Sequence, residues 1–324
     1  MDTSQVPQRR VLIWDRIGAN KTRTVLLIFG FVVFTALFFA AVGSIVAIYS
    51  GVSPDVDPTL TIQIAVAAAL IALAIGILMY YASTATVLAI SGAHQVGKAE
   101  EPEVYRIVEN LSIGSGLPMP KVWLIEDSAP NAFATGRNPE HAHVAVTRGL
   151  LDKLDKLELE AVLAHEMSHI GNYDIRIMTT VAVVVGLVAL AADLMLRFTW
   201  FGSGSRSGNK GKGEGAIALI ILAVAVLFII LSPFIASAMR FAISRQREYL
   251  ADASGALLCR NPTALASALE KISKDPEPLE AANKATAHLY IENPLKEHQS
   301  FLNSLFATHP PVEERIRILR AMGG

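Results

Sequence analysis

The stretch "LEAVLAHEMSHIGNYDI" (Leu159–Ile175) carries two histidines four residues apart, His165 and His169, and a glutamate directly after the first. Residues i and i+4 lie on the same face of a helix, so both imidazoles can reach one metal ion. Glu166 is then placed to meet a water molecule at that metal. The pattern predicts a catalytic metal site. The alternative is a surface helix with two solvated histidines.

A helix start precedes this motif. Asp155, with Glu158 three residues later, forms the pattern of a capping box. Apolar residues follow as the helix requires, at Leu157, Val162, Leu163 and Ile170. We therefore expect the HExxH sequence to lie on a helix that begins after Asp155.

A catalytic zinc site needs a third protein ligand besides two histidines. A compact third histidine would stand ten residues after His165, but that position is Ile175. A better candidate is Glu248 in "SRQREYLADASGALL", where Asp252 follows on the same helical face and can accept the other ring N–H of a ligand histidine. An ordinary charged helix face is the alternative. Asp174 is a second candidate ligand, although it fits better as a helix cap or as the partner of a nearby cation.

Short strands are predicted before the motif. "KVWLIED" (Lys121–Asp127) is a short apolar run, and "AHVAVTRGLL" (Ala142–Leu151) alternates before it turns toward helix. Between them lies "NAFATGRNPEH", and we expect its first part to form an exposed edge strand that pairs with substrate backbone. The residues of this strand are Asn131, Ala132, Phe133, Ala134 and Thr135. The alternative is a plain buried strand with Phe133 in the core.

The composition narrows the class of protein. Of 324 residues, 52% are hydrophobic and only 18% are charged, which argues against a wholly soluble chain. The net charge of −1 gives no sign of a nucleic-acid partner. The single cysteine, Cys259, excludes an internal disulfide and a cysteine-based zinc cluster.

Four apolar stretches are each long enough to cross a bilayer, which takes about 20 residues. The third is the weakest, because it contains Asp193 and Arg197. The second exceeds one crossing, so we expect its end to continue as helix beyond the bilayer. The four stretches are Val25–Tyr49, Leu60–Ala93, Met178–Phe198 and Gly215–Met239. The predicted fold is a mostly α membrane protein with about four transmembrane helices and a zincin-like α+β catalytic domain.

Flanking charge predicts the orientation of these stretches. Five basic residues precede the first stretch, which places the N-terminus and the HExxH region in the cytoplasm. The Gly/Ser-rich loop Gly202–Gly215 conflicts with this orientation, because it carries three basic residues yet falls outside. Alternatively, the third and fourth stretches form a membrane-buried hairpin that does not cross.

The C-terminal "THPPVEERIRILRAM" offers two more candidates. An N–H group of His309 or Arg315 can stabilise the oxyanion that develops when water attacks a carbonyl. The alternative is that His309 caps the helix and Arg315 pairs with a carboxylate such as Glu248 or Asp252. The other histidines outside the HExxH motif are expected to be solvated: His94, His141, His143, His288 and His298.

Four motifs together resemble the HtpX family of membrane-integrated zinc metallopeptidases. They are "NAFATG", "AVLAHEMSHIGNYD", "SRQREYLADASGA" and "THPPVEERIRILRAM". The likeness to the CAAX prenyl endopeptidases is more distant. The resemblance implies one Zn²⁺ per chain, bound by His165, His169 and Glu248, with Glu166 as the catalytic base. It points to His309 and Arg315 as further catalytic positions. It also implies a stress-response protease of the prokaryotic plasma membrane, with its active site facing the cytoplasm.

The sequence thus predicts a zinc endopeptidase that cleaves membrane or misfolded proteins. The alternative is a zinc-binding membrane scaffold that is catalytically silent. Polypeptides and the lipid bilayer are the expected partners, and no nucleic acid is expected. The expected division is a cytoplasmic segment 1–24, two transmembrane helices in 25–93, a first catalytic part 94–175, a transmembrane hairpin 176–239 and a second catalytic part 240–324.

Overall fold

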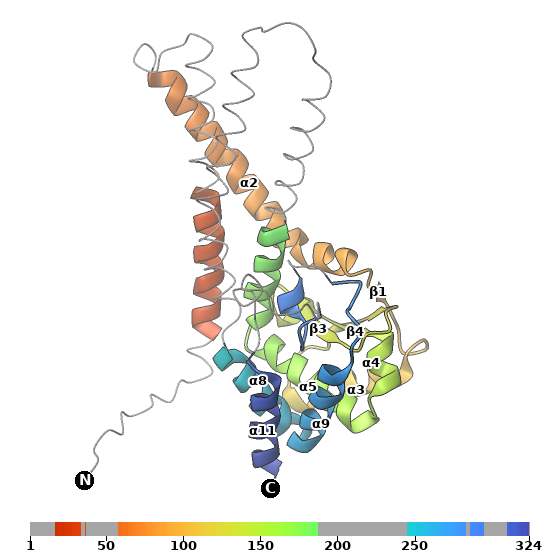
Figure 1. Ribbon diagram of the computed structural model, residues 1–324. Coiled ribbons are helices and arrows are strands. Elements are labelled where there is room, and N and C mark those ends of the chain that lie inside the picture. The colour runs from red at the N-terminus through yellow and green to blue at the C-terminus, as the bar shows by residue number, and fades with distance from the viewer. Residues whose placement is uncertain are drawn as a thin grey trace, which may run out of the picture.

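The computed structural model describes residues 17–33, 36, 58–186, 245–282, 286–294 and 310–323. Two long helices, an N-terminal one over 17–33 and α2 (Pro58–Ile90), stand out from a compact body (Figure 1). The body contains, in chain order, β1 (His94–Gln95), α3 (Pro102–Ser115), β2 (Lys121–Ile125), β3 (Ala132–Gly136), η1 (Pro139–His141), β4 (Ala142–Thr147), α4 (Arg148–Lys153), α5 (Lys156–Gly171), a helix over 174–186, α8 (Arg245–Cys259), α9 (Pro262–Lys274), η2 (Ala287–Leu289) and α11 (Val312–Gly323). The described part is therefore mostly helical, with one small sheet.

The small sheet has the strand order β1-β2-β4-β3, so β3 lies at one edge. β2 and β4 run parallel, with Trp123 opposite Ala145, while β3 runs antiparallel to β4 with Phe133 opposite the same Ala145. The strands predicted to begin at Lys121 and Ala142 are confirmed. β4 turns into helix α4 because Thr147 caps it, with its side chain accepting a hydrogen bond from the Leu150 N–H.

Helix α5 carries the HExxH sequence and begins as predicted. Asp155 accepts hydrogen bonds from the N–H groups at the helix start, and the Glu158 carboxylate accepts one from the Asp155 N–H, which completes a capping box. Glu158 also bonds Ser267 and Lys271, both at 2.6 Å, and so fastens α9 onto α5. From Leu159 to Ile170 nearly every residue of α5 is buried. The HExxH helix is therefore an interior helix, not a surface one.

Helix α8 approaches α5 unusually closely, because Gly255 has no side chain. A Cβ at that position would lie 2.8 Å from the backbone nitrogen of His165. Ala251 and Ala256 flank the same contact and are buried. This small-residue surface is the reason that Glu248 and Asp252, on the same helix, can reach the histidines of α5.

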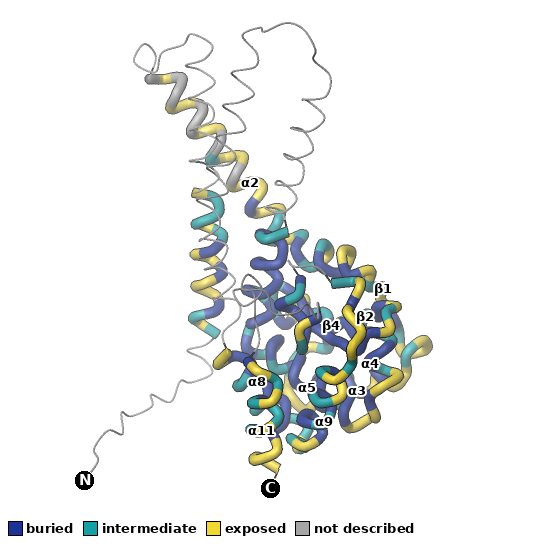
Figure 2. The backbone as a smooth tube through the Cα atoms, viewed as in Figure 1, coloured by how far each residue is buried: buried dark blue, intermediate teal, exposed yellow. Residues whose placement is uncertain are grey.

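The long helices are exposed along much of their length, as Figure 2 shows for α2, and their exposed residues include large apolar ones. Leu26 and Phe29 are 61% and 64% exposed, and Leu70 and Leu78 of α2 are 62% and 68% exposed. Within the described ranges, one helical segment, Ala69–Ile90, is long and apolar enough to cross a membrane by length and composition. The second apolar stretch forms one continuous helix of 33 residues, and its continuation beyond a bilayer remains a prediction.

Several membrane predictions fall outside the described residues. These are the charged pair Asp193 and Arg197, the loop Gly202–Gly215 and the whole fourth stretch Gly215–Met239. The first and third stretches are described only up to residues 33 and 186, apart from residue 36. The number of transmembrane helices and the domain boundaries therefore remain predictions.

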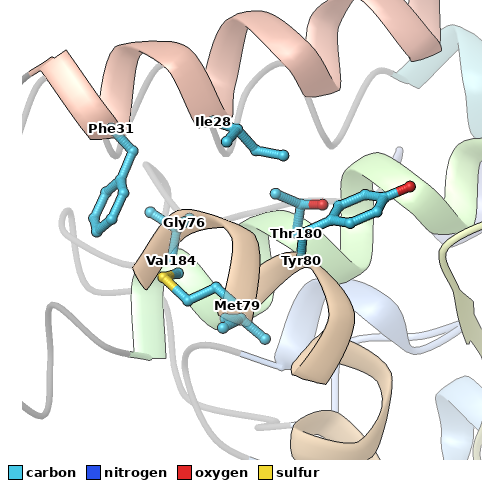
Figure 3. Close-up of a pocket in the computed structure, with 8 residues that line it drawn as sticks. Ile28, Phe31, Gly76, Met79, Tyr80, Thr180 and Val184 are labelled. Carbon is cyan, nitrogen blue, oxygen red and sulfur yellow. The ribbon is translucent and has the colours of Figure 1, made fainter. Parts of the chain in front are cut away.

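The N-terminal helix, α2 and the helix over 174–186 meet around an apolar pocket (Figure 3). The helices come close at Gly76 of α2, where a Cβ would lie 3.1 Å from the Val32 side chain. The pocket is lined by Ile28, Phe31, Gly76, Met79, Tyr80, Thr180, Val183 and Val184. The N-terminal helix thus contacts α2 and the helix over 174–186 through apolar side chains.

Two of the histidines that were expected to be solvated are not. His288 is fully buried, with its Nε2 3.0 Å from the Met178 carbonyl oxygen. His143 is half-buried on β4 and accepts a hydrogen bond of 2.8 Å from the Trp123 indole N–H. His94 and His141 are exposed as expected, and His298 lies outside the described residues. The expectation failed because β-strand pairing and a distant segment bury these two side chains.

Candidate metal centre

Three side chains from two helices converge on one point in the interior. His165 and His169 of α5 have their Nε2 atoms 3.2 Å apart. Glu248 of α8 places its carboxylate oxygens 3.9 Å from Nε2 of His165 and 3.7 Å from Nε2 of His169. All three side chains are buried, and their donor atoms lie within 4.8 Å of one another. Ligands of a tetrahedral zinc ion lie about 3.3–3.6 Å apart, so a small adjustment completes the site.

The other ring nitrogen of each histidine lies beside a carboxylate. Nδ1 of His165 is 3.0 Å from Asp252, and Nδ1 of His169 is 3.1 Å from Asp174. Each carboxylate favours the tautomer with the proton on Nδ1, which leaves both Nε2 atoms as lone-pair donors. Two such lone pairs facing each other at 3.2 Å repel unless a proton or a metal ion lies between them. The donor set therefore fits a divalent metal ion.

The charge of the cluster points the same way. Four carboxylates are buried here, those of Glu166, Asp174, Glu248 and Asp252, and two buried arginines, Arg247 and Arg315, face them. With both histidines neutral, as metal ligands must be, this leaves two negative charges in a water-poor interior. Buried charge is costly unless it is paired, so the cluster is electrostatically suited to a dication.

Two pKa values in the cluster reflect these pairs. Burial lowers the pKa of His169, but the hydrogen bond to Asp174 and the charge of Glu248 outweigh it and raise the pKa to about 9. Without metal this ring therefore carries a proton near neutral pH, and binding of a metal ion releases that proton. Burial raises the pKa of Asp252, but the charge and hydrogen bonds of Arg315 outweigh it and hold the pKa at about 2. Asp252 thus stays a carboxylate, able to orient the His165 ring.

Glu166 lies beside the histidines on α5 and is 1% exposed. Burial raises the pKa of its carboxyl group, although the two histidines and a hydrogen bond with the Ala134 backbone act against this. A carboxylate with a raised pKa is a better proton acceptor than an ordinary glutamate. The contact with Ala134 also places strand β3 directly next to the metal centre.

Arg315 is fully buried and bonds Asp252 through two nitrogens, Nε at 2.9 Å and Nη2 at 2.7 Å. Its Nη1 donates to the Ile291 carbonyl at 2.9 Å and lies 3.8 Å from Glu248. This is the carboxylate pairing that the sequence offered as the alternative to an oxyanion role. His309 lies outside the described residues, but Pro310, which follows it, is buried.

Strand β3 lies at the sheet edge as predicted, but the expectation that it is exposed is wrong. All five of its residues are buried. On its outer edge Tyr290 forms an isolated antiparallel bridge with Phe133, and the Ile291 N–H donates to the Ala132 carbonyl at 3.0 Å. Tyr290 also packs edge-to-face on the Phe133 ring, with centroids 5.0 Å apart. A chain segment from beyond α9 thus occupies part of this edge.

Asn131 precedes β3 and acts within the fold. Its backbone N–H donates to the Thr147 hydroxyl, and its side-chain amide donates to the Glu292 carbonyl at 3.2 Å. At the other end of the strand Thr135 and Gly136 bond the Thr179 hydroxyl. The two ends of β3 are therefore anchored by side chains from two different segments.

Sequence reasoning missed two residues at the site. Arg247 of α8 places Nη1 3.5 Å from Asp174, and Asn20 of the N-terminal helix donates to the same carboxylate at 2.7 Å. Asn20 gave no signal, because its burial and its partner, 154 residues away, appear only in the structure. Arg247 gave no signal, because it stands in a run of charged residues.

A buried pair of histidines on one helix, a carboxylate from a second helix and an adjacent glutamate define a metallohydrolase of the HExxH class. Residues 98–323 match the model of Peptidase family M48. The chain belongs to this metallopeptidase family, within its HtpX group.

Three sequence relatives agree with this assignment. A Protease HtpX homolog of Dictyoglomus turgidum is 43% identical over 310 residues, which cover 96% of this chain and 95% of that protein. One of Listeria innocua is 44% identical and covers 96% of this chain and all of that protein. One of Dictyoglomus thermophilum is 47% identical over 247 residues, 75% of this chain and 78% of that protein. The crystal structure of S. mikatae Ste24p matches with 18% identity and a TM-score of 0.46, covering 95% of this chain and 66% of that one.

Proposed function

We propose that this protein is a zinc-dependent endopeptidase with His165, His169 and Glu248 as the metal ligands. The observation that carries the proposal is the face-to-face arrangement of two Nε2 atoms at 3.2 Å beside a buried glutamate. Two imidazoles and one carboxylate suit zinc better than magnesium or calcium, which prefer all-oxygen sites. Zinc bound there would supply a Lewis acid that polarises the scissile carbonyl and makes water more acidic.

The protein's own groups then handle the proton. Glu166 accepts a proton from the attacking water and passes it to the amine of the leaving peptide. Asp252 and Asp174 keep the two histidines in the tautomer that presents Nε2. His309 is our candidate for the N–H that stabilises the developing oxyanion, and Arg315 supports the site by fixing Asp252.

Substrate backbone would pair with the outer edge of β3. The strand lies next to Glu166, and main-chain pairing holds an extended peptide whatever its side chains are. Because Tyr290 and Ile291 occupy part of this edge, substrate binding requires their displacement. Such a mode suits unfolded segments of membrane or misfolded proteins, which present free backbone.

The exposed apolar helices support a location in the cell membrane. A soluble protein rarely leaves a continuous apolar surface of this size in water. α2 and the N-terminal helix expose large aliphatic and aromatic side chains over several turns. We propose a multi-pass protein of the prokaryotic plasma membrane that acts in quality control, with the metal centre on the cytoplasmic side as the basic N-terminal segment indicates.

Casein cleavage by detergent-purified protein tests the function. Glu166→Gln keeps the shape of the side chain but cannot accept the proton, so we expect normal zinc content and a loss of turnover of about 10²–10⁴-fold. Glu160→Gln on the same helix is the matched control and should cleave normally. His169→Ala should lose zinc. Substantial cleavage by Glu166→Gln, or by wild type after complete removal of metal, would contradict the proposal.

A further inference from the structure

The foot of the N-terminal helix reaches the metal centre. Asn20 is 2% exposed, and its amide nitrogen donates to Asp174 at 2.7 Å and to the Asn172 carbonyl at 3.0 Å. The other oxygen of Asp174 lies 3.1 Å from Nδ1 of His169. Asn20 is thus one side chain away from a proposed metal ligand. Both partners are acceptors, which requires that the amide nitrogen, not the oxygen, faces them.

Two residues near Asn20 make contacts of their own, Thr24 within its own helix and Lys21 with the loop that carries Asp174. Thr24, one turn along, is fully buried and donates to the Asn20 carbonyl at 2.9 Å. The Lys21 ammonium lies 4.3 Å from the centroid of the Tyr173 ring. Tyr173 has φ of 60°, an unfavourable conformation for a bulky residue, which surrounding contacts must maintain. The N-terminal helix therefore contacts the turn that carries Asp174 through both Asn20 and Lys21.

The contact is specific rather than general packing. The Asn20 oxygen lies 3.5 Å from Nη1 of Arg247, which is itself 3.5 Å from Asp174. The amide therefore stands between a cation and an anion with each end facing the group it complements. A buried amide is costly unless both ends are bonded, so an apolar residue would be the simpler choice for packing alone.

We propose that Asn20 is a positioning residue of the metal centre, which holds Asp174 on His169 and so makes the N-terminal helix part of the site. This inference rests on the proposed metal ligands. Its consequence is that metal affinity depends on how that helix is seated against the body. The exposed apolar side chains of the same helix, Leu26 and Phe29, would rest in the bilayer.

Chelator competition on full-length protein in detergent measures the effect directly. We expect Asn20→Ala to weaken zinc binding by about 10-fold, the lower end of the effect of losing a group that bonds a ligand directly, because Asn20 acts through Asp174. Asn20→Asp should weaken it further, because it places a second carboxylate against Asp174. Thr24→Val is the matched control: it removes a buried hydroxyl that bonds only its own helix, and zinc affinity should not change.

A double-mutant cycle separates positioning from folding. If Asn20 acts through Asp174, then Asn20→Ala adds little to the loss caused by Asp174→Asn. Wild-type zinc affinity in Asn20→Ala, or a fully additive double variant, would overturn the proposal. If Asn20→Ala and Asn20→Asp do not fold, Asn20→Ser replaces them, because serine keeps a short hydrogen-bond donor. Its zinc affinity is then compared with that of the wild type. Zinc affinity is measured without substrate. The test of Asn20 therefore stands even if the protein does not cleave casein.

Discussion

At the scale of single residues, the metal centre consists of ligands and of the groups that orient them. Each histidine is held at Nδ1 by a carboxylate, and each carboxylate is held by a further polar residue. Asp252 is held by Arg315 from α11, and Asp174 by Asn20 from the N-terminal helix. A buried polar network stabilises the folded site only when every member is hydrogen-bonded. Loss of one outer residue should therefore lower the affinity for the metal.

Replacement of Arg315 tests whether a residue that does not contact the rings of the histidine ligands affects metal affinity. Arg315→Met leaves the buried Asp252 carboxylate without its cation, and we expect zinc affinity to fall by about 10–100-fold. Arg317→Met is the control, since Arg317 is on the same helix but exposed and paired with Glu314. Zinc titration and kcat are both measured. A fall in kcat of about 10²-fold at unchanged zinc affinity would instead assign Arg315 to the oxyanion.

At the scale of elements, the site is built where α5 is enclosed by α8, α9 and β3. The close contact at Gly255 lets α8 deliver Glu248 and Asp252 together. On the opposite side β3 lies beside Glu166, and its outer edge is partly occupied by the segment around Tyr290. The same segment accepts a hydrogen bond from Arg315 at the Ile291 carbonyl, so it connects the sheet edge to the metal centre.

The occupied edge predicts a competition between this segment and substrate. Ile291→Pro removes the N–H that bonds the Ala132 carbonyl, which should loosen the segment. One hydrogen bond contributes about 1 kcal/mol, so we expect KM for an unfolded substrate to fall by about 5-fold. Ile291→Val keeps the N–H and serves as the control. An unchanged or higher KM, in protein with normal zinc content, would show that substrate does not use this edge.

At the scale of the whole molecule, a buried polar centre lies beneath helices with exposed apolar surfaces. The N-terminal helix joins the two parts, since it contacts the metal-centre loop at Asn20 and lines the apolar pocket with Ile28 and Phe31. The sheet contacts α2 through β3 and carries its own titratable group, His143, paired with Trp123. The stability of the body is therefore expected to depend on pH through the sheet as well as through the site.

The stability should decrease as the pH falls from about 6.5 toward 4. Burial and the positive charge of Lys121 lower the pKa of His143 to about 4 from an ordinary value of 6.5. The unfolded chain takes up this proton below about 6.5, but the folded protein does so only near 4, so the folded state loses stability across that window. A protonated ring also cannot accept the Trp123 hydrogen bond. Thermal unfolding of wild type and His143→Leu, compared across this range, should show a smaller decrease in the variant. If the stability of the wild type and of His143→Leu decreased equally, the pH dependence would not come from His143.

The sequence by itself determined the local parts of the site. The spacing of His165 and His169 places them on one helical face, and the Asp155 capping box fixes where that helix begins, because both depend on residues a few positions apart. The apolar runs of β2 and β4 likewise predicted strands at the correct places. Glu248 was a candidate from spacing and from the resemblance, and the structure brings it to the histidines.

Only the tertiary structure decided what surrounds the ligands. Asn20 and Asp174 are separated by 154 residues, and Arg315 and Asp252 by 63, so no periodic pattern connects them. The burial of β3 depends on Tyr290 packing on Phe133 from a segment without regular spacing. Such contacts arise when separate elements share one interior, where each buried charge or amide must find its partner from whichever element lies next to it.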